Sequence, residues 1–483
     1  MSFKNRNSIK CIILILLASI LGCKKDFLDT SPTEQVDADE VFKSLEKIQI
    51  AMTGIYDLTT TASNTSAYSH NMILNADVKG GDVLIVSTGN YGRFTNGYQF
   101  VETVTSYEPT EYWATSYQII ANTNEFVDKI PSSPLNESQK KRYLAEARAL
   151  RAEAYFWLIR WFAKPYSLDP EAAGVPIISK PLGQYDTPPA RSKVKEVYAF
   201  ILEDLKFAEQ NLGEQNSIYR MNIPAIQGFL ARVYLTMENW PEAVKYAKLA
   251  RANKPLSPAN DLLKGFFSPT SEWIYAMNVR TDDNQGLLGV HSFYEPYDVG
   301  YSTFRATTEF FNSFAEADIR KKQFLVKSSV NADANTAIYR MKGEGYLINK
   351  FDYTTTTARN QVLIRSAEMW LIEAEAEARQ GITHETEAKL ALLEIQRRAG
   401  VATTVSPNTG DALIEEIMTE RSKELYGEGH KFFDLLRTKS PVNRTGSTSH
   451  WKIVNYLPGD KKLVLPIPQD EINANPNIEP NPL

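Results

Sequence analysis

The sequence has only two cysteines, Cys11 and Cys23, among its 483 residues. Two cysteines cannot build a disulfide framework, and Cys11 lies inside an N-terminal apolar run, so a bridge between them is not expected. The chain also lacks a surplus of basic charge, since its formal net charge is −5, and this argues against nucleic acid as a partner. Hydrophobic residues make up 43% of the chain and charged residues 23%, as in ordinary globular proteins. A noncovalent core must therefore hold the fold.

Signatures of catalysis and metal binding are also missing. There is no Gly-x-Ser-x-Gly elbow and no phosphate-binding loop. The five histidines lie far apart, without metal-ligand spacing: His70, His291, His384, His430 and His450. The stretch His384-Glu385-Thr386-Glu387 lacks the second histidine of a zinc protease, and Asp282-Asp283-Asn284 lacks the rest of a calcium loop. Glu420 and Glu424, one helical turn apart beside Arg421, favour structural ion pairs. The sequence therefore predicts no enzyme, no metal site and no cofactor.

The N-terminal segment has the pattern of an export signal. A start that carries Lys4, Arg6 and Lys10 precedes the short apolar run 11–22, which is too short to span a bilayer because a spanning helix needs about 20 residues. The ending Leu21-Gly22-Cys23 resembles a bacterial lipobox, in which the cysteine thiol receives a diacylglycerol and the chain is cut before it. We expect residues 1–22 to be a lipoprotein signal peptide, Cys23 the lipidation site and 23–40 a lipidated tether. A plain signal peptide with an incidental cysteine is the alternative.

Helical periodicity dominates the rest of the chain. One helix face recurs at spacings of three and four residues before Pro165: Ala147, Leu150, Ala154, Trp157 and Trp161. Helical hairpins are predicted at 224–252, with a turn at Asn239-Trp240-Pro241-Glu242, and at 363–400, with a break at Gly381. A further helix is expected from Asp411, which would cap it, to Tyr426. Small residues at helical spacing in units of about 34 residues resemble tetratricopeptide repeats, although unrelated hairpins would give a similar pattern.

We therefore predict an all-α dominated fold, built of tetratricopeptide-like hairpins with long irregular loop insertions. Residues 41–483 are expected to form one domain with three parts. The N-terminal helical-repeat part is 41–252. The loop-rich insertion at 253–360 has weak helical periodicity, and its length indicates a segment that is either functional or locally structured. We predict that it binds the ligand. The C-terminal helical part is 361–483 and ends in an extended, proline-rich tail.

Two aromatic loops are the candidate ligand-binding surface. The stretches STGNYGRFTNGYQF and HSFYEPYDVGYSTF place rings among glycines and polar residues, where no helical face would bury them. The candidate residues are Tyr91, Arg93, Phe94, Tyr294, Tyr297 and Tyr301. Flat rings at a loop surface suit stacking against sugar rings or peptide side chains, and plain packing is the alternative.

At this point the chain resembles a known family. The stretches RYLAEARALRAEAYFWLIRWFAKPY, IPAIQGFLARVYLTMENWPEAVKYAKLA, TEFFNSFAEADIRKKQF, IMTERSKELYGEGHKFFDLLR and LPIPQDEINANPNI resemble, in order, the characteristic segments of the SusD/RagB family of Bacteroidetes outer-membrane nutrient-binding lipoproteins. Two local departures are Thr438, where the family usually has Trp, and the ending Asn481-Pro482-Leu483.

The resemblance implies a surface lipoprotein that caps a SusC-like TonB-dependent transporter. Such a protein binds a nutrient, usually an oligosaccharide, delivers it for import and catalyses nothing. It is held at the cell outer membrane by its lipid anchor and faces the exterior, without nucleic acid as a partner. The alternative is a peptide-binding or scaffold helical-repeat lipoprotein of the outer membrane.

Overall fold

The computed structural model describes residues 38–60, 68–87, 89–183, 186–282, 284–296, 300–325, 345–351 and 358–482. The predicted signal peptide 1–22, the lipidation site Cys23, the tether up to residue 37 and the candidate Tyr297 lie outside these residues. Within the part of the chain that is described, no helix is both long enough and apolar enough to span a membrane.

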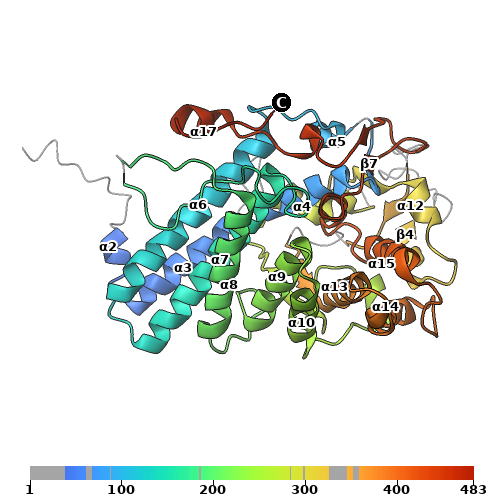
Figure 1. Ribbon diagram of the computed structural model, residues 1–483, viewed down its shortest axis with the longest axis horizontal. Helices are drawn as coiled ribbons and strands as arrows, with labels where there is room; N and C mark the ends of the chain where they lie inside the picture. The colour runs from blue at the N-terminus through green and yellow to red at the C-terminus, as the bar shows by residue number, and fades with distance from the viewer. Residues whose placement is uncertain are drawn as a thin grey trace, which may run out of the picture.

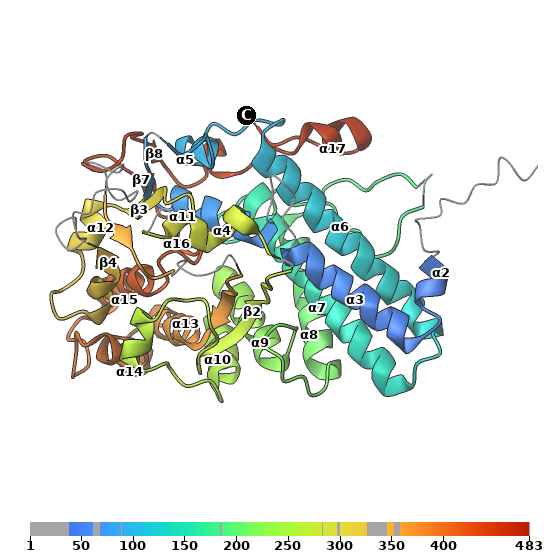
Figure 2. The same ribbon diagram turned by 180° about the vertical axis from the view of Figure 1, so that it is seen from behind.

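A row of helices, each packed on its neighbours, forms the body of the molecule (Figures 1 and 2). The helices are α3 (Leu45–Thr60), α6 (Tyr107–Lys129), α7 (Glu137–Phe162), α8 (Val194–Asn211), α9 (Ile223–Thr236), α10 (Trp240–Arg251), α13 (Ser366–Arg379), α14 (Glu385–Ala399) and α15 (Gly410–Glu424). Each of α6 to α10 packs on the next, α10 packs on α13, and α13 packs on α14 and α15. The all-α prediction with paired helices is confirmed. The two predicted hairpins, separated in sequence, are continuous in space because α13 packs directly on α10.

Local capping explains where these helices begin. Asn136 precedes α7, accepts a hydrogen bond from the Gln139 backbone N–H and donates its own backbone N–H to the Gln139 side chain, which completes a capping box. Asn239, the first residue of the predicted turn, is the N-cap residue of α10. The prediction that Asp411 caps α15 is wrong, because that helix begins at Gly410. Asp411 lies in its first turn, where a carboxylate still favours the helix dipole.

Shorter elements complete the chain. The short helices and the buried α4 are α2 (Ala38–Val41), α4 (Tyr68–Lys79), α5 (Thr95–Gln99), α11 (Val290–Tyr294), α12 (Thr308–Asn312), α16 (Lys431–Arg437) and α17 (Gln469–Ala474). The 3-10 turns are η2 (Ile130–Ser132), η3 (Ala259–Leu263), η4 (Gly286–Leu288), η5 (Ile319–Gln323), η7 (Ile382–His384) and η8 (Lys461–Leu463). Every residue of α4 is buried, since α3, α5, α6, α11 and α16 surround it. The proline-rich tail, expected to be extended throughout, contains the short helix α17 after Pro468.

Short antiparallel ribbons join segments that are distant in sequence. They pair β1 (Val83–Ile85) with β3 (Phe304–Ala306), β2 (Trp273–Met277) with β6 (Gln361–Arg365), β4 (Phe324–Leu325) with β5 (Leu347–Ile348), and β7 (Val442–Asn443) with β8 (Asn455–Tyr456). In the first ribbon Ile85 lies opposite Phe304. The chain that leaves β1 and the chain that enters β3 therefore meet at one end of this ribbon.

A buried ionic network, which we call the Arg365 network, ties the C-terminal half together. Its members are Glu272, Asp318, Arg320, Lys350, Arg365, Arg398, Glu424 and Glu428. Nη1 of Arg365 lies 2.6 Å from Oε1 of Glu424 and 3.0 Å from Oε1 of Glu272. Burial alone would raise the pKa of Glu424, but Arg398, Arg365 and Arg320 together lower it well below its usual value. The carboxylate is therefore held charged inside the core.

The ion pairs predicted from the sequence are confirmed, with different partners. Glu420 and Glu424 pair with Arg320, whereas Arg421 pairs with Asp434 through its Nε, at 2.8 Å from Oδ2. Helical spacing correctly showed that these carboxylates share a face, but the cations that reach them come from other elements.

Candidate ligand-binding surface

The two predicted aromatic loops meet at the open end of the β1–β3 ribbon. Tyr91 is 81% exposed, and Arg93 and Tyr301 are half-buried. The ring centres of Tyr91 and Tyr301 are 6.1 Å apart, and Cζ of Arg93 lies 4.8 Å from the ring centre of Tyr301. We call these three residues the aromatic platform. It joins two rings and one guanidinium from loops that are distant in sequence.

The first loop is fixed by Asn90. Its side-chain amide donates hydrogen bonds to the carbonyl of Val86 and to the Thr95 hydroxyl, at 3.2 Å each, and its oxygen accepts from the Gly92 N–H at 2.9 Å. Tyr91 has φ 54° and Phe94 has φ 56°, in the left-handed region. Such a conformation in a bulky residue costs on the order of 1–3 kcal/mol and persists only where neighbouring contacts impose it. The loop is therefore held in one shape that displays Tyr91.

The second loop folds back on α11. The carbonyl of Ser292 accepts hydrogen bonds from the N–H groups of Tyr301 and Ser302, at 2.8 and 2.9 Å. The buried Glu295 carboxylate accepts from the Gly300 N–H at 3.0 Å and from the Ser302 hydroxyl. A Cβ atom on Gly300 would lie 2.8 Å from the Ser292 carbonyl oxygen, so this close approach requires glycine. Tyr301 is thereby fixed beside the first loop.

A layer of buried rings supports the platform. Phe293 stacks on Tyr301 with 4.8 Å between ring centres, and Phe94 meets Phe293 edge-on at 5.1 Å. Phe94 is only 7% exposed. The prediction that Phe94 is a surface ring is therefore wrong, because its left-handed backbone turns the ring inward onto Phe293 and Phe304.

Tyr294 is also a core residue, contrary to the prediction. The structure forms one turn of helix at Val290–Tyr294, and all five of its residues are buried. The Tyr294 hydroxyl donates a hydrogen bond to Oδ2 of Asp77 at 2.8 Å. Burial raises the pKa of Asp77 to about 7, although the bond from Tyr294 acts in the opposite direction. Sequence composition predicted an irregular segment here, and packing against α4 produced a helix instead.

One exposed aromatic was missed by the sequence analysis. Trp451 is 39% exposed, and its Nε1 donates a hydrogen bond to the carbonyl of Ile85 at 2.8 Å. Because Ile85 ends β1, the indole lies at the base of the first loop. The signal was present, since Trp451 follows a stretch rich in Gly, Ser and Thr (residues 445–449), as the predicted rings do.

A polar groove of about 400 Å³ lies at the other end of the β1–β3 ribbon. Asp82 and Thr307 flank the ribbon there, and Glu309, Lys431 and Asn443 line the groove with them. These side chains donate and accept hydrogen bonds as sugar hydroxyls do. They come from separate segments, so no local pattern could reveal them. Among the described residues, no group of three His, Cys, Asp or Glu side chains could hold a metal ion.

Comparison with sequence families gives two matches. The model described as "SusD family" matches residues 319–483, and the model described as "Starch-binding associating with outer membrane" matches residues 26–235. Among curated proteins, SusD-like protein P38 of Formosa agariphila is 24% identical. The alignment is 540 residues long and covers 99% of each chain.

Solved structures share the fold over almost the whole length. A SusD superfamily protein from Bacteroides thetaiotaomicron has a TM-score of 0.81 and 27% identity, and the alignment covers 93% of this chain and 100% of the other. A laminarin-binding SusD-like protein has a TM-score of 0.73 and 24% identity, with 91% and 100% covered. The overall fold is therefore that of these proteins.

Proposed function

The chain belongs to the SusD/RagB family, and from this premise we propose that it is a non-catalytic binding protein for an oligosaccharide nutrient. The aromatic platform is the observation that carries the proposal. Tyr91 exposes its ring on the loop surface, Tyr301 meets it edge-on, and the Arg93 guanidinium lies over the Tyr301 ring with its donors available to a ligand. Sugar rings have apolar faces and hydroxyl edges, which suit stacking on tyrosine and hydrogen bonding to arginine.

The proposed assembly is an importer. We propose that the protein caps a SusC-like TonB-dependent transporter and delivers the glycan to it on the outer face of the outer membrane. The match to a family described as "Starch-binding associating with outer membrane" supports the location, and the transporter partner follows from the family resemblance. The loop-rich part 253–360 supplies Tyr301, in keeping with its proposed ligand-binding role.

Calorimetric titration of a soluble form without the signal peptide and the lipidation cysteine (residues 24–483) against a polysaccharide panel tests the binding proposal. We expect Tyr301→Ala and Tyr91→Ala each to weaken glycan binding by about tenfold or more, because a central stacking residue commonly contributes 2 kcal/mol or more. Absolute affinity is expected to be modest, since an open platform buries less of its ligand than a deep pocket.

Tyr219→Ala is the matched control, because Tyr219 is a half-exposed tyrosine that lines a separate cleft. Its glycan affinity should equal that of the unmodified protein. Unchanged affinity in both platform variants would reject the platform as the binding site. If peptides bind and no glycan does, the peptide-binding alternative replaces the glycan proposal.

We further propose that Cys23 carries the lipid anchor. The apolar run 11–22 before it has twelve residues, too few to span a bilayer, and acyl chains on Cys23 would supply the membrane attachment. We expect Cys23→Ser to abolish incorporation of labelled palmitate and to release the protein from the membrane fraction, whereas Cys11→Ser leaves both unchanged. A Cys23→Ser protein that is still labelled and still sediments with membranes would contradict the assignment.

A further inference from the structure

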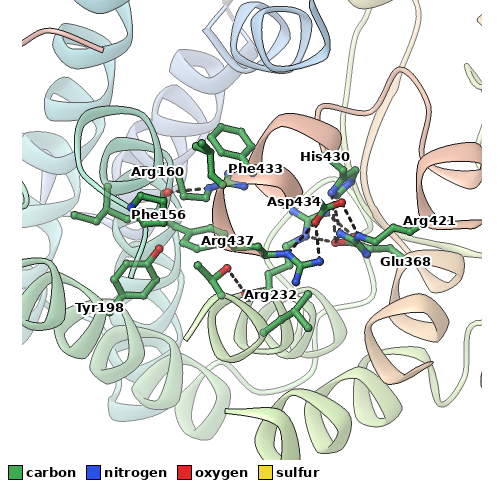
Figure 3. Close-up of a pocket in the computed structure, with 15 residues that line it drawn as sticks. Phe156, Arg160, Tyr198, Arg232, Glu368, Arg421, His430, Phe433, Asp434 and Arg437 are labelled. Carbon is green, nitrogen blue, oxygen red and sulfur yellow. Dashed lines mark hydrogen bonds and ion pairs between the residues drawn. The ribbon is translucent and has the colours of Figure 1, made fainter. Parts of the chain in front are cut away.

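A cavity rich in arginine lies between the helical row and α16, away from the aromatic platform (Figure 3). It encloses about 40 Å³ and takes its walls from α7, α8, α9, α13, α15 and α16. Its charged lining residues are Arg160, Arg232, Glu368, Arg421, Asp434 and Arg437. Phe156, Leu235 and Phe433 make much of the remaining wall apolar. We call it the arginine cavity.

The carboxylates of the arginine cavity are already paired. Glu368 receives Nε and Nη2 of Arg232 at 2.7 Å each. Asp434 receives Nε of Arg421 at 2.8 Å and Nε of Arg437 at 2.9 Å. Four arginines thus face two carboxylates in the lining, and one of these arginines, Arg437, also has a bidentate pair with Glu375 behind the wall.

Arg160 is left over in this set of pairs. Among the described residues it forms no ion pair with a carboxylate, and its Nε donates to the carbonyl of Phe156 at 3.1 Å. The rings of Phe156, Trp157 and Phe433 surround its guanidinium, with centres 4.2 to 4.4 Å from Cζ. Burial and the nearby Arg232 lower the pKa of Arg160 to about 9, so it is still charged at neutral pH. Arg160 is half-buried, and within the described residues its Nη1 and Nη2 atoms donate no hydrogen bond to the protein, so they can bind a ligand.

A second donor in the lining is also unsatisfied. Arg421 is 3% exposed, and its Nη1 is buried and donates to no acceptor among the described residues. Buried N–H groups are nearly always hydrogen-bonded. An unpaired one at a cavity wall therefore indicates that an acceptor binds in the cavity. Figure 3 shows Arg160 with Phe433 on one side of the cavity and Arg421 with His430 on the other.

The size of the cavity restricts what could enter. A single water needs about 10–15 Å³ of such space, so 40 Å³ suits a ligand of a few non-hydrogen atoms better than a sugar ring. The apolar wall and the unpaired cation favour a ligand with one negative charge. We propose that the arginine cavity binds a small monovalent anion, a halide or a carboxylate of the size of acetate, with Arg160 as the pairing charge. The ion would fasten α7 to α16.

Anomalous scattering from crystals soaked in sodium bromide tests this in the unmodified protein. We expect a bromide peak inside the cavity, next to the Arg160 guanidinium. An empty cavity, or one that holds only water under these conditions, would overturn the proposal. The result is independent of glycan binding, because the cavity and the aromatic platform share no residue.

Calorimetric titration with acetate tests the role of Arg160. Gluconate keeps the ionic strength constant during the titration. We expect Arg160→Gln to weaken acetate binding at least tenfold. Arg142→Gln, an exposed arginine on the same helix α7, should leave it unchanged. Equal acetate affinity in all three proteins would mean that bromide in the crystal is an adventitious ion only. Glucuronate that binds as tightly as acetate would overturn the restriction to small ions. If Arg160→Gln does not fold, the bromide experiment decides.

Discussion

Replacing Arg365 with alanine is expected to lower the free energy of unfolding by about 3–5 kcal/mol, as is found when one partner of a buried ionic group is removed. Arg365 is 1% exposed and lies in β6, where it contacts three carboxylates. Without it, Glu272, Glu424 and Glu428 would keep part of their charge in the core with fewer partners. Chemical denaturation followed by circular dichroism measures the change.

Arg397→Ala is the control for this experiment. Arg397 lies in α14, pairs with Glu394 at 2.7 Å and is 52% exposed in its side chain. An exposed pair of this kind contributes about 0–1 kcal/mol. Similar losses of stability in the two variants would contradict the view that burial makes the Arg365 network important.

Replacing Tyr294 with alanine is expected to lower the free energy of unfolding by about 3–5 kcal/mol, the usual cost of deleting a buried aromatic ring. The ring packs against Phe304, Phe351 and Tyr426, with ring centres 5.2 to 5.8 Å apart. Its loss would leave a cavity and would also remove the hydroxyl that donates to Asp77. Comparing the free energy of unfolding of this variant with that of Tyr301→Ala distinguishes a core tyrosine from a platform tyrosine.

Tyr294→Phe is the matched control, since it keeps the ring and removes only the hydroxyl. Asp77 would retain the hydrogen bond from the Gly429 N–H at 2.8 Å, so a loss of about 1–3 kcal/mol is expected. A Tyr294→Ala protein of unchanged stability that has lost glycan binding would show that the ring belongs to the binding surface.

Local patterns were enough to predict the helices. Asn239 and Pro241 mark the start of α10, and Pro165 follows the end of α7, because capping and proline effects act over a few residues. The packing of α13 on α10 depends on contacts across more than one hundred residues of chain, and no periodicity encodes it. The boundaries proposed at 252 and 360 stay predictions, since helices on both sides of them pack together.

The candidate site was predictable only in part. Tyr294 and Tyr301 lie in the same aromatic stretch, and composition gives them the same environment. Asp77 distinguishes them, because its buried carboxylate takes the Tyr294 hydroxyl into the core. Tyr91 is exposed and Arg93 is half-buried, and their contact with Tyr301 depends on the pairing of β1 with β3.

The β1–β3 ribbon has a consequence for protein engineering. It consists of three residue pairs, and the two loops of the proposed binding surface are attached at the same end. The two loop sequences could be exchanged between proteins of this family while the β1–β3 ribbon and the helices beneath it stay constant. A one-residue insertion within the ribbon would turn the side chains of that strand to the opposite face. It would therefore misalign both loops at once. Libraries that test the proposed sugar binding are therefore best confined to the two loops, residues 87–94 and 296–302.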